Sequence, residues 1–303
     1  MGDRDWITES VGPEAWQQLS AGLSGTQLQS LLLEVMQRRA QRRAAPEVLA
    51  QYQRDGFCQP ASADLRVSLA LDQHFLEVMP EFQAIELSPV APLATCSAVA
   101  LTDQNRVLSA LRGCEVVSDP TNVLALECAT RLRTQPSQPV HLATSQRVIR
   151  AQPHPKLPGF APHFRLFALA SAGREAKDHA FTADALTLHI RSMLAALDRI
   201  AMHGYGIGAR RVVLLATPER QALAQRVAAL LPSVEVGHQQ LEHAYYSGGL
   251  RYQIWCTPLA AADELPVIDG GVFDWLEKIS SNRRAVFVAS GCGTQLLALR
   301  FRK

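Results

Sequence analysis

The chain has 303 residues, of which 48% are hydrophobic, so it can bury a large core and is not expected to be disordered. Its 30 basic and 28 acidic residues leave a net charge of +2, which excludes a general polyanion-binding surface. The six cysteines show no Cys-x-x-Cys and no clustered Cys/His spacing, which excludes a zinc site or a disulfide framework and favours reduced thiols.

Residues 1–60 are expected to form a helical arm. The first ten residues lack a basic region followed by an apolar run, and no stretch approaches about 18 apolar residues, so we expect a cytoplasmic protein without a membrane span. Residues 26–43 carry an apolar stripe at helical spacing, made of Leu28, Leu31, Leu32, Val35 and Met36. The stripe runs into Arg38, Arg39, Arg42 and Arg43, which form either a solvated helix face or a surface that meets phosphates.

The next segments predict helices separated by short extended pieces. Residues 64–79 form an amphipathic helix that stops before Pro80 and leads into an extended segment. A helix over 103–112, a strand over 114–117 and a helix over 122–133 follow. The sequence SDPTN before the last of these is typical of a helix cap, with Thr121 or Asn122 as the capping residue.

Residues 148–167 predict two paired strands that could hold a nucleotide. The loop between them, 153–162, contains four prolines and Gly159, so it holds its shape at little entropic cost. Arg150 offers a planar cation for a phosphate and Phe167 offers a ring face for a base. His163 or Arg165 offers a second cation for the outer phosphates. The alternative is an ordinary hairpin with a surface loop.

The C-terminal half predicts a long helix followed mainly by strands. Residues 182–206 carry apolar side chains on one side and end in glycines. Strands are expected over 211–216, 234–237, 249–256 and 285–293, with a helix over 218–231. These elements lack the regular alternation of a doubly wound parallel sheet. The sequence therefore predicts an α+β fold in which an antiparallel sheet is flanked by helices.

Several separated motifs together resemble the catalytic core of class II aminoacyl-tRNA synthetases, and within them the histidyl branch. The helix 64–79 with the strand that ends at Pro89 or Pro92 resembles the first motif, and 148–167 resembles the second. The segments YYSG at 245–248 and DGGVFD at 269–274 are similar to histidyl motifs, and SGCGTQLLALRF resembles the third motif. The resemblance covers residues 64–303, and a core domain is expected over 61–303.

The resemblance implies a set of site residues, with Arg150 on the α-phosphate as the catalytic residue. The implied ATP-binding residues are Arg150, Gln152, His163, Arg165, Phe167, Gly291, Gly293 and Gln295. The implied pocket for a small carboxylate or amino acid contains Tyr245, Tyr246, Arg251, Gln253, Gly270 and Gly271. ATP and Mg²⁺ are the implied cofactors, no residue of the chain is assigned as a metal ligand, and the first motif implies a homodimer.

The chain also departs from the family pattern at charged positions. Gln295 or Leu296 stands where the third motif has an arginine that grips the triphosphate, and Gln152 replaces the acid of the second motif. Loss of such a charge-assisted contact costs roughly 1.5–3 kcal/mol. The chain ends close to the third motif, so we expect no anticodon-binding domain and no charging of tRNA by this protein alone.

Two functions follow from these features. The first is an enzyme that forms an adenylate from a small carboxylate and ATP. The second is a regulatory pseudo-synthetase, similar to the regulatory subunit of ATP phosphoribosyltransferase, that binds a ligand without turnover and a protein partner through its N-terminal helices. A third, an RNA-binding factor that uses the Arg38–Arg43 stripe, has less support.

Overall fold

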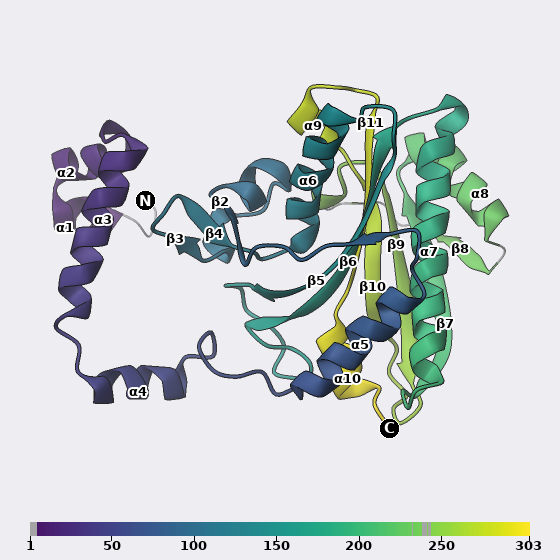
Figure 1. Cartoon of the computed structure of the whole chain (residues 1–303), viewed down its shortest axis with the longest axis horizontal. Helices are drawn as coiled ribbons and strands as arrows, with labels where there is room; N and C mark the ends of the chain where they lie inside the picture. The colour runs from purple at the N-terminus through teal and green to yellow at the C-terminus, as the bar shows by residue number, and fades with distance from the viewer. Residues whose placement is uncertain (1–4, 232, 238–240, 242–243) are drawn as a thin grey trace.

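The computed structural model describes residues 5–231, 233–237, 241 and 244–303. Within them, eight strands form one large sheet (Figure 1). In spatial order these are β1 (Gln83–Ala84), β5 (Val140–Ile149), β6 (His163–Arg174), β11 (Ala285–Cys292), β10 (Leu265–Phe273), β9 (Leu250–Pro258), β7 (Ile207–Ala216) and β8 (Val234–Gly237). Neighbouring strands are antiparallel except for the two outermost pairs, β1 with β5 and β7 with β8.

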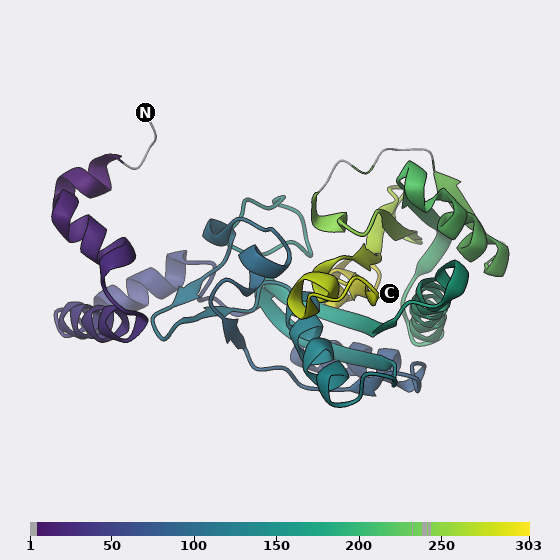
Figure 2. The same ribbon diagram turned by 90° about the horizontal axis from the view of Figure 1, so that it is seen from above.

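Helices cover both faces of this sheet (Figures 1 and 2). One face packs against α5 (Leu65–Glu77), α7 (Ala180–Ala201), α8 (Gln221–Leu230) and α10 (Thr294–Arg300). The other face packs against α6 (Pro120–Thr134) and α9 (Trp275–Ser280). The expected α+β fold, with a mainly antiparallel sheet flanked by helices, is confirmed.

The long helix α7 follows its apolar pattern closely. Its side chains Leu186, Ile190, Met193 and Leu197 are fully buried against the sheet. They recur every three or four residues, so they form one face of the helix. Removing this much apolar surface from water stabilises the fold by about 1.5–3 kcal/mol for each large side chain.

The segment 103–112 is not a helix as the sequence predicts. It contains a single turn of 3-10 helix at Gln104–Arg106 and then β3 (Ser109–Ala110), which pairs with β4 (Cys114–Val116). Gly113, with φ of +68°, allows the tight reversal between them. β4 also pairs with β2 (Val90–Pro92), which gives a small second sheet. Pairing with these neighbours overrides the local helical pattern.

The N-terminal segment is helical and extends away from the large sheet (Figures 1 and 2). Its helices are α1 (Asp5–Val11), α2 (Pro13–Gln17), α3 (Gly25–Ala40) and α4 (Ala45–Arg54). Ser24 caps α3, because its hydroxyl accepts a hydrogen bond from the Gln27 amide at 3.3 Å. The Gln27 side chain in turn accepts one from the Ser24 amide at 3.0 Å. The expected helix over 26–43 is present, although it begins at Gly25 and ends at Ala40.

Candidate functional site

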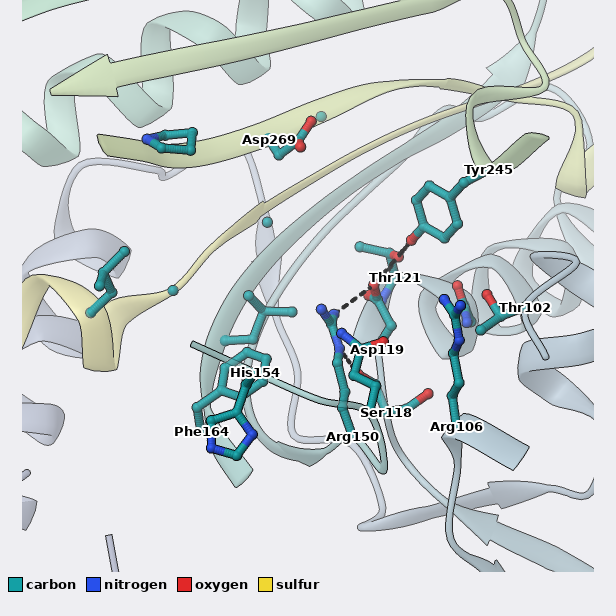
Figure 3. A pocket seen from close by; sticks show the side chains of 18 of the residues that line it. Thr102, Arg106, Ser118, Asp119, Thr121, Arg150, His154, Phe164, Tyr245 and Asp269 are labelled. Carbon is teal, nitrogen blue, oxygen red and sulfur yellow. Dashed lines mark hydrogen bonds and ion pairs between the residues drawn. The ribbon is translucent and has the colours of Figure 1, made fainter. Parts of the chain in front are cut away.

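A cavity of about 620 Å³ opens on the α6 side of the large sheet (Figure 3). The first turn of α6, the loop after β5, strand β6, the Tyr245–Tyr246 turn and the strands β9 to β11 all contribute to its wall. The volume is typical of small-molecule sites, which usually measure about 300–1,000 Å³. Polar groups gather on two sides of this cavity.

Asp119 organises the first polar side. As the N-cap of α6, its carboxylate accepts hydrogen bonds from the Thr121 amide at 3.0 Å and the Thr121 hydroxyl at 2.7 Å. It also accepts one from the Tyr245 hydroxyl at 3.0 Å and pairs with Arg150 at 3.2 Å (Figure 3). The Arg150 Nε donates to the Ser118 carbonyl at 2.9 Å. Arg150 is therefore held by the start of α6.

Asp269 organises the second polar side. Its carboxylate accepts hydrogen bonds from the Tyr246 hydroxyl at 2.6 Å and from Arg251 Nε at 3.0 Å. The Arg251 guanidinium also lies 4.7 Å from the centre of the Tyr246 ring. Burial raises the pKa of Tyr245 and of Tyr246, and the nearby carboxylates act in the same direction. Both phenols are therefore neutral hydrogen-bond donors.

Two further groups add ligand-binding capacity to the cavity. Asn122 is 3% exposed, and its side-chain oxygen has no hydrogen-bond partner among the described residues. A buried acceptor of this kind gains from a ligand that donates a hydrogen bond. Arg106 lines the cavity, and within the described ranges no carboxylate forms an ion pair with it. With Arg150 and Arg251 against Asp119 and Asp269, the lining carries a net positive charge.

The proline-rich loop after β5 rests on the start of α10. At Gly159, which has φ of +96°, an added Cβ would lie 2.6 Å from the Leu296 side chain and 3.3 Å from its Cα. The backbone of the loop thus approaches Leu296 as closely as only glycine permits. Leu296 is one of the two residues, with Gln295, at which the family resemblance places the arginine that grips a triphosphate.

The structure brings most of the expected residues to the cavity. Those that line it are Arg150, Gln152, Gly291, Gly293, Tyr245, Tyr246, Arg251 and Gly270. Those that do not are His163, Arg165, Phe167, Gln295, Gln253 and Gly271. The first three lie on β6, where successive side chains point to opposite faces of the sheet. Phe164 and Leu166 are the β6 residues that face the cavity instead.

His163, Arg165 and Phe167 have structural partners on the other side of the sheet. The His163 ring lies 2.9 Å from Arg147 Nη1 and 2.7 Å from the Gln59 carbonyl oxygen. Arg165 pairs with Asp72 of α5 at 2.6 Å, and the Phe167 ring lies 5.0 Å from that of Phe75. The ring that meets the Arg150 guanidinium, at 5.2 Å, is Phe164.

Gln295, Gln253 and Gly271 also lie outside the cavity lining. Gln295 is 2% exposed and its side-chain oxygen is 3.4 Å from Arg147 Nη1. Gly271 lies against the Leu250 carbonyl oxygen, which would be 2.3 Å from an added Cβ. Sequence reasoning missed Asp119, because it expected Thr121 or Asn122 to cap the helix whereas Asp119 is the N-cap, and it missed Asp269, which it treated as part of a glycine turn. The polar residues beside these motifs were the available signal.

A buried hydrogen-bonded chain lies beneath the cavity. The Tyr252 hydroxyl donates to Ser290 Oγ at 2.6 Å, and Ser290 Oγ is 2.6 Å from His189 Nδ1. His189 Nε2 is 2.9 Å from Ser171 Oγ, which is 2.6 Å from His141 Nδ1. Burial, together with the nearby His141, lowers the pKa of His189 to about 3. Because Ser290 also lines the cavity, the chain connects the cavity floor to β5.

The described residues contain neither a metal-binding cluster nor a membrane-spanning helix. In those ranges no group of three or more His, Cys, Asp or Glu side chains is placed to hold a metal ion. No helix in the same part of the chain is both long enough and apolar enough to cross a bilayer.

Comparisons with known proteins bear on the fold. No family model matches the sequence, and no curated protein matches it. Among solved structures, an ATP phosphoribosyltransferase regulatory subunit/histidyl-tRNA synthetase from Bacillus halodurans C is 14% identical with a TM-score of 0.58, over 79% of this chain and 82% of that chain.

Histidyl-tRNA synthetase from S. aureus is 13% identical with a TM-score of 0.55, over 75% of this chain and 64% of that chain. A putative threonyl-tRNA synthetase from Aeropyrum pernix is 12% identical with a TM-score of 0.58, over 77% of this chain and 58% of that chain. At these identities the similarity concerns the fold. The chain has the fold of a class II aminoacyl-tRNA synthetase catalytic core.

Proposed function

We propose that this protein is a non-catalytic, synthetase-like regulator that binds an amino acid or a similar small carboxylate. The contact of Gly159 with Leu296 is the observation that carries the proposal. It forms the wall of the cavity at Leu296, one of the two positions where the family pattern has a cation for the triphosphate. The side built from Tyr246, Arg251 and Asp269 is left intact. The cavity thus retains the features of a small-molecule site but has a neutral side chain, that of Leu296, at this position.

ATP and Mg²⁺, the cofactors implied by the family resemblance, fit these residues poorly. Arg150 is already paired with Asp119 and bonded to the Ser118 carbonyl, so its charge is partly neutralised. Both cavity carboxylates, Asp119 and Asp269, are occupied by arginine and tyrosine donors, which leaves neither available as a ligand for a hard cation. The proposal therefore includes no adenylation step and gives Arg150 a binding role.

The polar groups suit a ligand with one anionic and one donor-rich end. Arg106 offers a guanidinium group for a carboxylate, which such groups bind through paired hydrogen bonds, and Arg150 adds the part of its charge that Asp119 does not neutralise. Asn122 offers an unfilled acceptor, and Asp119 adds negative charge close by, so an ammonium group fits there. The tyrosine hydroxyls then discriminate among side chains.

The regulatory role rests on one structural neighbour. The Bacillus halodurans protein is named as an ATP phosphoribosyltransferase regulatory subunit/histidyl-tRNA synthetase. We infer a similar arrangement here, in which ligand binding to the cavity controls a partner enzyme. The homodimer and the cytoplasmic location expected from the sequence remain predictions.

Calorimetry and isotope exchange together test the proposal. Titration of the protein with each amino acid, with and without MgATP, should reveal one ligand whose affinity does not depend on the nucleotide. Exchange of pyrophosphate into ATP should not increase when that ligand is added. Exchange that requires the amino acid would contradict the proposal and favour the enzyme hypothesis.

A substitution at Arg251 tests whether the ligand binds in this cavity. Arg251→Ala should weaken binding of the ligand at least about tenfold, because the Asp269 carboxylate loses its partner and no longer holds Tyr246 in place. The control is Arg211→Ala, which removes a similar pair on β7 with Glu264 at 2.7 Å, away from the cavity. Equal affinities for both variants would show that the ligand does not bind in this cavity.

A further inference from the structure

The N-terminal helices bury none of their own side chains. Between Trp6 and Pro60 every residue is exposed or half-exposed, although the segment contains most of α1 and all of α2, α3 and α4. In both ribbon views these helices extend away from the sheet (Figures 1 and 2). We refer to residues 5–60 as the arm.

Helices with this exposure do not maintain themselves in water. Isolated helices shorter than about 12–15 residues are marginal even in favourable sequences, and α1, α2 and α4 have 7, 5 and 10 residues. The longest, α3, has 16 residues and only just exceeds that length. Its stripe is exposed at Leu31, Val35 and Met36, by 41%, 40% and 50%. Trp6 on α1 and Leu49 on α4 are 63% and 55% exposed. The arm therefore needs a second apolar surface to cover it.

The distribution of charge along the arm indicates which kind of partner covers its apolar stripe. Residues 1–23 contain four acidic residues and one basic residue, whereas residues 24–60 contain five basic and three acidic residues. The basic charge is concentrated directly after the stripe, at Arg38, Arg39, Arg42 and Arg43. Among the described residues only Arg38 of these four pairs with a carboxylate, that of Glu34 at 2.6 Å. The arm thus carries two halves of opposite sign, which makes it complementary to itself.

If two copies of α3 pack antiparallel, their apolar stripes are covered and their oppositely charged segments come close together. If two copies of α3 cross at Leu32, the midpoint of the stripe, the apolar segments cover one another. The same register places Arg39 near the C-terminal end of one α3 opposite Gly25 at the start of the other, the end that adjoins the acidic segment 1–23. By two-fold symmetry the contact occurs twice.

We propose that the arm is a self-association element, in which two copies of this chain pair their N-terminal helices antiparallel, acidic half against basic half. A different protein would have to supply the same stripe and the same charge pattern, which a second copy supplies by itself. The class II core is not needed for this contact.

Two charge-swapped full-length variants test the proposal. Variant A carries Glu9→Lys and Glu14→Lys, so that both halves of its arm are basic. Variant B carries Arg39→Glu and Arg42→Glu, so that both halves are acidic. Each variant alone should fail to pair its arms, whereas a mixture of A with B brings opposite charges together at both contacts. No other partner for the arm predicts this restoration.

Hydrogen exchange of peptides from residues 5–54 reports on the arm irrespective of contacts made by the core. In the unmodified protein, protection should rise with concentration, and in A or B alone it should fall at least about tenfold and return in the equimolar mixture. Protection that is independent of concentration would overturn the proposal. Protection that persists in A or B alone, or is not restored by mixing, would overturn it as well.

Discussion

Gly270 and Gly291 both line the cavity floor, on neighbouring strands, yet their surroundings differ. A Cβ on Gly270 would lie 2.6 Å from Ser290 Oγ, 2.6 Å from the Tyr252 ring and 2.8 Å from the Ala289 carbonyl oxygen. A Cβ on Gly291 would lie 3.6 Å from Leu166, which is an ordinary contact. At Gly270 the absence of a side chain is therefore a packing requirement.

Substitution of these two glycines gives a matched pair. Gly270→Ala should lower the free energy of unfolding by about 1–3 kcal/mol, because the new methyl group overpacks a rigid site. Gly291→Ala should change it by no more than about 0.5 kcal/mol. Urea unfolding of both variants measures the difference. A Gly270→Ala protein as stable as Gly291→Ala would contradict the packing around Ser290.

Single side chains were also the hardest feature to predict from the sequence. The sequence identified the strand pair and placed Arg150 at the cavity, but it assigned Phe167 to the cavity where the structure has Phe164. A shift of one residue along a strand moves a side chain to the opposite face, and local sequence does not fix that register. The α5 residues that bury Phe167 are about ninety positions away in the chain.

At the scale of elements, the start of α6 joins helix capping to the ligand site. Asp119 and Asp64 both cap helices, and the Asp64 carboxylate accepts a hydrogen bond from the Arg66 amide at 2.8 Å. Only Asp119 also holds Arg150 and Tyr245. The two aspartates therefore differ in what their removal leaves without a partner.

Alanine substitutions at these caps separate the two roles. Asp64→Ala should cost about 1 kcal/mol, the usual value for a lost N-cap. Asp119→Ala should cost about 1–3 kcal/mol more, because Arg150 and Tyr245 lose a partly buried acceptor. Chemical denaturation followed by circular dichroism measures both. Equal costs would mean that the Asp119 contacts beyond the cap contribute nothing to stability.

At the scale of the whole molecule, the fold class was predictable because it depends on many residues at once. The apolar side chains along one face of α7 and the succession of strands after it indicated an antiparallel sheet with helices. No single residue decided this prediction. Segment 103–112 shows the limit of this reasoning. Its helical pattern gave way to pairing with β4, a contact that depends on the turn at Gly113.

Acid should destabilise the whole molecule through His189. Its pKa of about 3 lies below the ordinary value of 6.5, so the folded state keeps this ring neutral while the unfolded state takes up a proton. Stability is therefore full above pH 6.5 and falls as the pH drops toward 3. Between pH 7 and pH 5 the loss from this group is about 2 kcal/mol.

The variant His189→Gln isolates that contribution. It should be less stable than the unmodified protein at pH 7, and the difference should narrow by about 2 kcal/mol at pH 5, because glutamine does not titrate. Thermal unfolding over this pH range provides the measurement. A difference that stays constant with pH would show that His189 does not stay neutral in the fold.

The chain of hydrogen bonds through His189 also has a single orientation. Because the Tyr252 hydroxyl donates to Ser290, the Ser290 proton points at His189 Nδ1, and the hydrogen of His189 must then sit on Nε2. That hydrogen points at Ser171, whose own proton points at the Nδ1 of His141. The four donor groups, on Tyr252, Ser290, His189 and Ser171, therefore all point from the cavity floor toward β5. The tautomer of His189 is thus set by the Tyr252 hydroxyl, which lies two hydrogen bonds away. Replacement of Tyr252 by phenylalanine would leave that alignment free to reverse.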